Sequence, residues 1–421
     1  MHGSPRVASD FCLNCYISAM TEYPDAPLTL LRNANVFAPE PLGLKQLLTG
    51  GGRILWMDEA NAEPPHGLPI EVVDLQGQML APGLVDGHVH VTGGGGEDGF
   101  CSRVPALPLS RYTRGGVTTV IGLLGTDDLA RSPRELVAHL HGLREEGLSA
   151  WGYCGGYHLP AATLTGSIRG DIAFIDCLIG VGELAISDHR SSQPSLDELL
   201  RVASEAHVAG LMSGKAGIVH LHLGNGARGL ELVRRALDGS ELPPRVFNPT
   251  HVNRRRGLFE EALELARRGC WVDITAFPVA EDEDAWSATD ALDRYLQSDL
   301  PGERVSVSSD AGGCLPCFDI EGRISHMDIG APGALLDSVR ELLQRGRGLN
   351  EVLPAFTSNP ARLLRLRRKG RIAVGNDADL LVLDHQLQLK DVMARGVWHL
   401  RDGESVRRGS FEPARAAAQS Q

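Results

Sequence analysis

The chain has 421 residues, of which 43% are hydrophobic and 22% are charged, and its formal net charge at pH 7 is −12. That length can bury one large core together with a smaller appended domain. The negative charge argues against a nucleic-acid partner, which would need clustered positive charge. The one basic run, at 362–371, is interrupted by leucine, and we interpret it as a solvated helix end. No apolar run reaches the roughly 18 residues of a membrane span.

The N-terminal region lacks the basic start and apolar stretch of a secretory signal. We therefore expect a disordered arm over residues 1–27, with Met20 as an alternative start. Eight cysteines without regular spacing predict reduced thiols and a cytoplasmic location rather than a disulfide framework. Zinc binding by cysteine would require two C-x-x-C pairs to meet in space, and we interpret the two pairs as coincidence: Cys12/Cys15 and Cys314/Cys317.

After this arm, residues 28–80 read as short strands separated by turns. From residue 84 to residue 310 one pattern then recurs roughly every 30 residues: a short β-branched run, a polar or glycine-rich turn, and a stretch with helical spacing of apolar residues. Eight such units predict an α/β fold, a (β/α)₈ TIM barrel over 81–355. A doubly wound sheet is the alternative, but it rarely needs eight equal units. The eight runs lie at 84–90, 117–125, 149–157, 179–187, 217–224, 246–251, 271–277 and 304–310.

The last segment, 356–412, is again rich in strand-like runs, such as those in GRIAVGNDADLLVLD. It does not fit the barrel pattern, and neither does 28–80. We therefore expect the two segments to meet in space as one small β-sandwich domain, although they lie at opposite ends of the barrel sequence.

Five metal-binding side chains fall at the carboxyl ends of the predicted strands, where TIM-barrel enzymes place their active sites. His88 and His90 are separated by one residue, so on a strand both side chains point to the same face. His222, His251 and Asp310 end the fifth, sixth and eighth runs. A lone histidine in an apolar strand is usually a hydrogen-bonded core residue. Five residues at strand ends are better explained as ligands of Zn²⁺ or a similar divalent ion.

These residues lie in motifs that resemble the amidohydrolase superfamily, through PGLVDGHVH, the later histidines and the final aspartate. The sequence is more closely similar to the isoaspartyl dipeptidases (β-aspartyl peptidases) within that superfamily. This resemblance covers residues 28–412 and includes HVHVTGGGGE, GLSAWGYCGGYHLP, AISDHRSSQP, PTHVNRR and SSDAGG. Of these, HVHVTGGGGE and the ISDHR part of AISDHRSSQP are far more specific than a general H-x-H pattern.

The resemblance implies two divalent metal ions, with zinc as the default, and hydrolysis by a metal-bridged hydroxide. His88, His90 and Asp310 would hold the more buried ion, and His222 and His251 the more exposed one. Asp310 would also accept the proton of the attacking water and pass it to the leaving amine. The resemblance further implies that Tyr157 donates a hydrogen bond to the developing oxyanion. We interpret His220, which shares a face with His222, as a core residue.

The substrate that the resemblance implies is a small dipeptide with one ammonium group and two carboxylates. Glu97 suits the ammonium, helped by the backbone of Gly95 and the hydroxyl of Thr126. Arg190 and Arg254 suit the carboxylates, since a guanidinium group pairs with a carboxylate through two hydrogen bonds. The resemblance also suggests a homo-oligomer, without an interface that the residues reveal.

Two positions depart from the family pattern. The family bridges its metals with a carboxylated lysine on the fourth strand, and this sequence has Glu183 there, preceded by an apparent extra residue, Gly182. Glutamate presents the same carboxylate on a shorter stem, so we expect the strand to bulge inward. A mononuclear site or a lost activity is the alternative. Cys314 stands where the family has a serine near the substrate carboxylate, and a thiol is the poorer hydrogen-bond donor.

The resulting hypothesis is metal-dependent hydrolysis of isoaspartyl dipeptides. Another amidohydrolase reaction, such as deacylation of an N-acyl amino acid or hydrolysis of a cyclic amide, is the runner-up. An N-acyl substrate has no ammonium for Glu97, which favours the dipeptide. A non-catalytic scaffold is the third possibility, but such a protein should have lost metal ligands.

Overall fold

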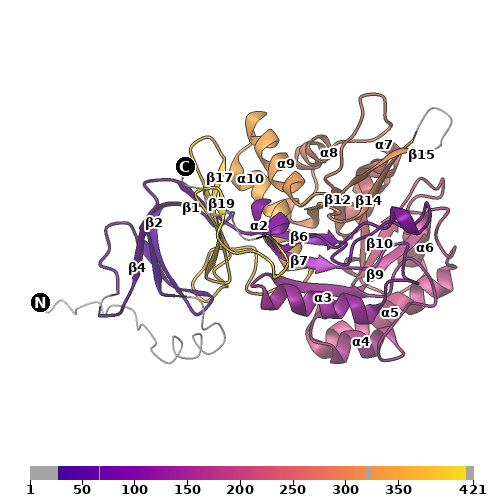
Figure 1. Cartoon of the computed structure of the whole chain (residues 1–421). Helices are drawn as coiled ribbons and strands as arrows, with labels where there is room; N and C mark the ends of the chain where they lie inside the picture. The colour runs from indigo at the N-terminus through magenta and orange to yellow at the C-terminus, as the bar shows by residue number, and fades with distance from the viewer. Residues whose placement is uncertain (1–26, 66, 319–323, 414–421) are drawn as a thin grey trace, which may run out of the picture.

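The computed structural model describes residues 27–65, 67–318 and 324–413. Figure 1 shows two lobes, a strand-rich lobe built from both terminal segments and a larger lobe of parallel strands and helices. Residues 1–26 of the expected arm, with Met20 and the pair Cys12/Cys15, lie outside the described residues. Among the described helices, none is long and apolar enough to cross a membrane.

The strand-rich lobe contains one continuous nine-stranded sheet, in the order β19-β18-β17-β16-β5-β1-β2-β3, with β4 pairing β1. Antiparallel pairing of β5 with β16 joins the two terminal segments, as the sequence predicts. The sheet is strongly curved (Figure 1) and encloses side chains such as Leu31, Leu80 and Val382, so the expected layers are parts of a single sheet. The strands are β1 (Thr29–Phe37), β2 (Pro41–Gly50), β3 (Arg53–Glu59), β4 (Glu71–Asp74), β5 (Met79–Pro82), β16 (Leu380–Leu383), β17 (Leu389–Ala394), β18 (Val397–Arg401) and β19 (Glu404–Ser405).

All eight strand runs of the repeated pattern form strands in the larger lobe. Strands β6 to β11 make a curled parallel half-barrel sheet, and β12 and β13 pair in parallel beside it. The chain just after β13 returns to β6, where the His90 backbone N–H donates to the Ala311 carbonyl at 2.8 Å. The strands are β6 (Leu84–Val89), β7 (Val117–Gly122), β8 (Ser149–Cys154), β9 (Leu178–Ser187), β10 (Val219–Leu223), β11 (Phe247–Thr250), β12 (Val272–Thr275) and β13 (Val305–Ser308).

Helices follow the parallel strands and cover the outside of this lobe (Figure 1). The longest, α5, begins at a capping box in which Ser195 and Glu198 bond each other's backbone N–H groups. An antiparallel pair, β14 (Cys314–Phe318) and β15 (Ile324–Ile329), follows β13. The α-helices are α2 (Leu109–Arg114), α3 (Pro133–Glu145), α4 (Ile168–Phe174), α5 (Leu196–Ser213), α6 (Glu231–Asp238), α7 (Arg256–Arg267), α8 (Ala288–Gln297), α9 (Gly333–Gln344), α10 (Leu349–Val352) and α11 (Ser358–Leu363). The 3-10 helices are η1 (Phe100–Ser102), η2 (Pro244–Val246), η3 (Val252–Arg254), η4 (Gly302–Arg304) and η5 (Leu353–Phe356).

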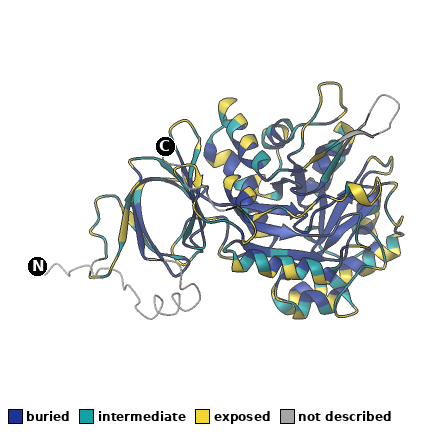
Figure 2. Cartoon of the chain, viewed as in Figure 1, coloured by how far each residue is buried: buried dark blue, intermediate teal, exposed yellow. Residues whose placement is uncertain are grey.

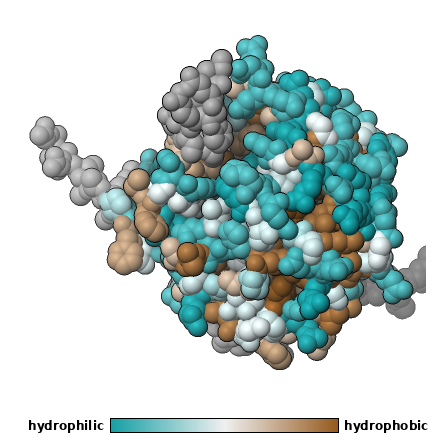
Figure 3. Space-filling view, turned by 90° about the vertical axis from the view of Figure 1, so that its right-hand side faces the viewer, coloured by the Kyte–Doolittle hydropathy of each residue, from teal (hydrophilic) through white to brown (hydrophobic). Residues whose placement is uncertain are grey.

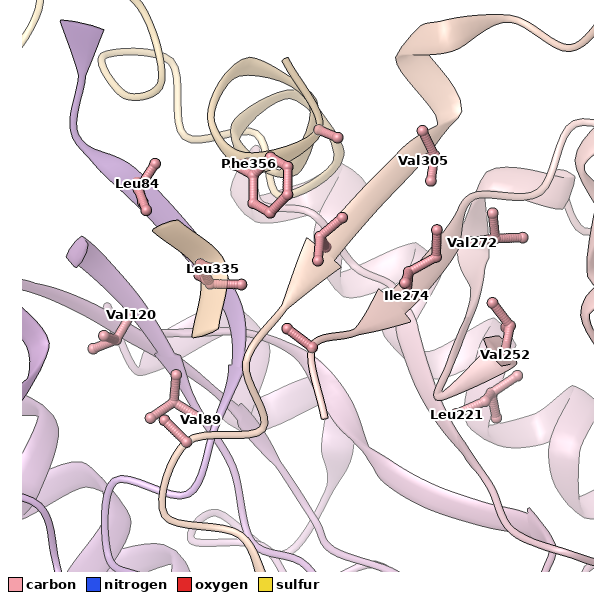
Figure 4. Close-up of a cluster of buried hydrophobic side chains, with 14 of the residues drawn as sticks. Leu84, Val89, Val120, Leu221, Val252, Val272, Ile274, Val305, Leu335 and Phe356 are labelled. Carbon is pink, nitrogen blue, oxygen red and sulfur yellow. The ribbon is translucent and has the colours of Figure 1, made fainter. Parts of the chain in front are cut away.

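The core of the larger lobe lies between its strands and helices (Figure 2). Figure 4 shows part of it, a cluster of buried side chains that includes valine, leucine and isoleucine of the parallel strands together with Leu335 of α9 and Phe356 of η5. A second cluster joins side chains of the parallel strands, such as Val85 and Ile121, to Leu363 and Leu364 at the end of α11.

The basic run at 362–371 is not wholly solvated, which corrects the interpretation from sequence. Lys369 is only 5% exposed. Its Nζ lies 2.5 Å from Asp379 Oδ2 and 2.8 Å from Asp377 Oδ2. It also donates to the Ser149 hydroxyl at 2.6 Å. A buried ammonium requires such partners, so Lys369 ties the segment before β16 to the start of β8.

Candidate metal centre

The five side chains that the sequence singles out as metal ligands are buried together at the carboxyl ends of the parallel strands. His88 lies in β6 with His90 directly after it, and His222 lies in β10. His251 directly follows β11, and Asp310 lies two residues after β13. His251 and Asp310 have left-handed backbone conformations, with φ of 58° and 52°. Such conformations are uncommon outside glycine and cluster at functional sites.

Glu183 of β9 lies between these histidines, and its two oxygens face different ones. Oε1 is 3.6 Å from His88 Nε2 and 3.5 Å from His90 Nε2. Oε2 is 3.0 Å from His222 Nδ1 and 3.3 Å from His251 Nε2. The two carboxylate oxygens thus face different imidazole pairs, although the His88 and His251 rings also lie close together, with 4.8 Å between their centroids.

A bulge in β9 brings Glu183 inward, as the extra residue in the sequence predicts. The register between β9 and β10 shifts by one residue between two pairs, Val219↔Val181 and Leu221↔Leu184. Gly182 lies in this bulge with φ 151°, and a Cβ there would be 2.6 Å from the His220 carbonyl oxygen. Only glycine fits such a close approach without displacement, so Gly182 lets the short glutamate stem reach the centre.

A chain of hydrogen bonds sets the orientation of the His88 ring. Asn248 Oδ1 lies 2.8 Å from His220 Nδ1, and His220 Nε2 lies 2.9 Å from His88 Nδ1. Since Oδ1 can only accept, His220 carries its proton on Nδ1 and accepts from His88 Nδ1. In the neutral ring that binding of a metal ion would require, the free lone pair of His88 is then on Nε2, which faces Asp310 Oδ1 at 3.3 Å. His220 is thus a buried core residue, as the sequence predicts, and it also supports a ligand.

The site stabilises positive charge between its carboxylates. Burial alone would raise the pKa values of Glu183 and Asp310, but the neighbouring His88 lowers both well below the usual range, with His222 adding to the effect on Glu183. Burial alone would lower the pKa of His88, and Glu183 followed by Asp310 raises it to about 9. A divalent cation supplies the positive charge that these carboxylates favour.

The donor atoms fit a metal ion. Among the described residues, His88 Nε2 and Asp310 Oδ1 are buried without a hydrogen-bond partner, although buried polar atoms normally have one. Imidazole nitrogens and carboxylate oxygens are suitable ligands for Zn²⁺. Three overlapping groups of buried side chains have ligand atoms within 4.8 Å of one another: His88/His90/Glu183, His88/His251/Asp310 and Glu183/His222/His251.

Tyr157, just after β8, is buried beside this cluster. Its hydroxyl oxygen lies 2.8 Å from His222 Nδ1. Burial, followed by the charge of Glu183, raises the pKa of Tyr157 well above its usual value, against the opposing effect of Arg190 and Arg254. The phenol therefore stays protonated and can donate a hydrogen bond at the edge of the site.

The predicted substrate-binding residue Arg190 lies beside the cluster, with its Nη2 3.5 Å from His222 Nε2. We call this edge, at the carboxyl ends of the parallel strands, the opening of the site. Glu97 and Arg190 form an ion pair, with 2.8 Å between Oε1 and Nη1, and each side chain is 21% exposed. The Thr126 hydroxyl is buried without a hydrogen-bond partner among the described residues. Figure 3 looks onto the face toward which β6 and β7 point in Figure 1, where hydrophobic atoms gather within a largely hydrophilic surface.

Two further predicted contacts lie at the edge of this opening. Arg254 ends η3, and its backbone N–H donates to the His251 carbonyl at 3.0 Å. Cys314 begins β14 and lies beside Gly95. Burial raises the pKa of the Cys314 thiol to about 11, with Glu97 adding to the effect. The side chain of Cys317, its partner in the C-x-x-C motif, lies outside the described residues.

Sequence reasoning missed two buried aspartates that support the ligands. Asp188 directly follows β9 and bonds both Arg190 and His222. Asp86 in β6 accepts from the Ser309 hydroxyl and, at 3.1 Å, from the Ser309 backbone N–H, next to Asp310. Both occur in the quoted motifs ISDHR and VDGHVH, so an acidic residue inside each motif was the available signal.

Residues 79–399 match the model of the amidohydrolase family. The chain therefore belongs to that family, and it is an enzyme of the class that hydrolyses amide bonds. Family membership implies metal-dependent chemistry, generally with two ions, and the clusters above are consistent with it.

Among solved structures, the chain is similar to the β-aspartyl dipeptidase of Fervidobacterium islandicum in complex with a β-Asp-Leu dipeptide. The two are 41% identical, with a TM-score of 0.85, over 90% of this chain and 98% of that one. A deacetylase from Agrobacterium fabrum is 26% identical over 80% of this chain and 77% of its own length. A D-hydantoinase from Thermus sp., at 18% identity and a TM-score of 0.64, shares the fold.

Proposed function

We propose that this chain is a β-aspartyl (isoaspartyl) dipeptidase that holds two divalent metal ions, most readily Zn²⁺, bridged by Glu183. The observation that carries this proposal is the position of the Glu183 carboxylate, with Oε1 toward His88 and His90 and Oε2 toward His222 and His251. Asp310 completes the first pair, 3.1 Å from His90 Nε2. The shorter stem of glutamate is offset by the bulge at Gly182.

Two ions in these positions would supply an acidified water and polarise the scissile carbonyl. Asp310, which His88 keeps ionised, would accept the proton of that water and deliver it to the leaving amine. Tyr157, kept protonated by burial, would donate to the oxygen that becomes negative during attack. His88 is held for ligation by its hydrogen bond with His220.

Charge recognition would select the dipeptide. Glu97 and Arg190 neutralise each other across 2.8 Å at the opening. A substrate with an ammonium and a carboxylate can exchange this pair for two new ion pairs, whereas a substrate with one charge would leave the other group unpaired. Arg254, Thr126, Gly95 and Cys314 would complete the substrate contacts. The similarity to a β-aspartyl dipeptidase that binds β-Asp-Leu supports the same substrate class.

The second candidate is deacylation of an N-acyl amino acid, which the similarity to the Agrobacterium deacetylase favours. The two are separated by comparing β-Asp-Leu, α-Asp-Leu and N-acetyl-leucine as substrates of the zinc-loaded enzyme. We expect cleavage of β-Asp-Leu and at least about 100-fold lower kcat/KM for the other two. N-acetyl-leucine lacks the ammonium and one carboxylate, and two lost charged contacts are worth roughly 3 kcal/mol or more. α-Asp-Leu carries the same charges at different positions around the scissile amide, so it cannot pair them and place that amide correctly at once. Preference for N-acetyl-leucine would refute the dipeptidase proposal.

We also propose that the eight parallel strands act as one closed (β/α)₈ barrel over 81–355, with 28–80 and 356–412 as the small β domain. The return of the chain after β13 to β6, through Val89 and Ala311, supports closure. The packing of Leu363 and Leu364 with side chains of the parallel strands suggests that the start of the last segment also serves the barrel.

A further inference from the structure

Asp188 contacts both the metal cluster and the substrate opening. It directly follows β9 and is only 5% exposed. Its Oδ2 lies 3.0 Å from His222 Nε2 and accepts from Arg190 Nη2 at 2.7 Å. Its Oδ1 accepts from Arg190 Nε at 3.0 Å and from the Arg190 backbone N–H at 2.8 Å. His189 Nδ1 is a more distant neighbour, 3.4 Å from Oδ1.

Both ring nitrogens of His222 face carboxylates: Nε2 lies 3.0 Å from Asp188 Oδ2, and Nδ1 lies 3.0 Å from Glu183 Oε2. With a metal ion at Nδ1, the ring proton would be on Nε2 and donated to Asp188, because an ionised carboxylate can only accept hydrogen bonds. A carboxylate behind a metal-binding histidine fixes the ring and increases its basicity.

The contact with Arg190 fixes the guanidinium group. Asp188 engages Nε and Nη2 with its two oxygens, a bidentate arrangement that restricts the plane of the group. The remaining Nη1 points to Glu97 at 2.8 Å. Asp188 therefore leaves one edge of Arg190 for partners at the opening.

The chain leaves space for this carboxylate at Gly224, directly after β10. A Cβ on Gly224 would lie 2.1 Å from Asp188 Oδ2. Any side chain there would displace the oxygen that bonds both His222 and Arg190. This observation is independent of the hydrogen bonds, and it indicates that the loop geometry is built around the position of Asp188.

We propose that Asp188 is a positioning residue that couples the more exposed metal site, through His222, to recognition of the substrate carboxylate, through Arg190. The inference rests on the proposed dipeptidase function. Since one oxygen serves both partners, displacement of Asp188 disturbs metal binding and substrate binding together.

The test compares Asp188→Asn with Arg190→Lys in the full chain. Zn²⁺ affinity is measured by competition with a chelator, and kcat and KM are measured separately with β-Asp-Leu on zinc-saturated enzyme. An amide has one acceptor oxygen, so its NH₂ group must face either the Arg190 Nε and backbone N–H or the pair His222 Nε2 and Arg190 Nη2. We therefore expect Asp188→Asn to weaken one of the two zinc sites by about 10- to 100-fold and to raise KM by about tenfold or more. Arg190→Lys keeps the positive charge but lacks the guanidinium group that pairs with a carboxylate through two hydrogen bonds. This variant should raise KM and leave zinc affinity unchanged.

Gly224→Ala provides a second variant that leaves Asp188 itself intact, and it should reproduce both defects. Asp128→Asn is the matched control, because Asp128 bonds His158, whose Nε2 meets only the Arg190 carbonyl. It should leave zinc affinity unchanged. Thermal unfolding of each variant verifies that it is folded.

A change in KM alone, or in zinc affinity alone, for folded Asp188→Asn would overturn the coupling. If wild-type enzyme neither binds zinc nor cleaves β-Asp-Leu, the proposed function fails instead. The two failures are therefore distinguishable, because the first requires an active wild-type enzyme.

Discussion

Replacing Gly182 with alanine should destabilise the protein and displace Glu183. The new Cβ would lie 2.6 Å from the His220 carbonyl oxygen and 2.8 Å from His220 Cβ, at a φ of 151°. Overpacking of a buried site costs about 1–3 kcal/mol, and holding alanine in a glycine-only conformation costs about 1–3 kcal/mol more. We expect the free energy of unfolding to fall by about 2–6 kcal/mol, with a loss of bound metal.

Urea denaturation of the metal-free protein measures the free energy of unfolding, and metal analysis of the folded variant measures the loss of bound metal. Gly142→Ala, in helix α3, is the control: no atom lies within 4 Å of its added Cβ. Alanine favours helix there, so that variant should be more stable by about 0.5–1 kcal/mol. If Gly182→Ala matches the wild type within about 0.5 kcal/mol and retains full metal content, the argument for the bulge is wrong.

Two further predictions concern other buried groups. Burial, followed by Arg407 and Arg395, lowers the pKa of His399 to about 3, whereas the unfolded chain binds that proton near pH 6.5. The neutral ring thus contributes stability above pH 6.5 that is lost as pH falls toward 3. Between pH 7.5 and pH 5, the free energy of unfolding of His399→Phe should therefore fall by about 2 kcal/mol less than that of the wild type, as measured by urea denaturation. Equal decreases in the two proteins would refute this. Tyr157→Phe should lower kcat by about 10²–10³-fold without changing metal content, and a change in kcat below threefold would remove Tyr157 from the mechanism.

The strands and the places of the candidate ligands could be read from the sequence because both depend on local pattern. Apolar β-branched runs followed by helical stretches predict parallel strands. A polar residue at the end of such a run lies at the carboxyl edge of the sheet, because parallel strands all end at the same edge. His222 and Asp310 were predictable on that basis, and so was the inward bulge at Glu183, from one extra residue in the run.

Contacts between loops could not be predicted in this way. Glu97 and Arg190 are 93 residues apart in the sequence, and their ion pair depends on how two strand-end loops meet. The burial of Lys369 depends on Asp377, Asp379 and the start of β8. A basic run gives no sign that one of its members will be desolvated, because desolvation is decided by tertiary partners.

The central claim is that Glu183 bridges two metal ions, and metal content per chain tests it most directly. Wild type, Glu183→Ala and Glu260→Ala, an exposed position in α7, are loaded with Zn²⁺, desalted and analysed for zinc and protein. We predict two ions for wild type and for Glu260→Ala, and one or none for Glu183→Ala. Equal zinc content in wild type and folded Glu183→Ala would contradict the bridging role.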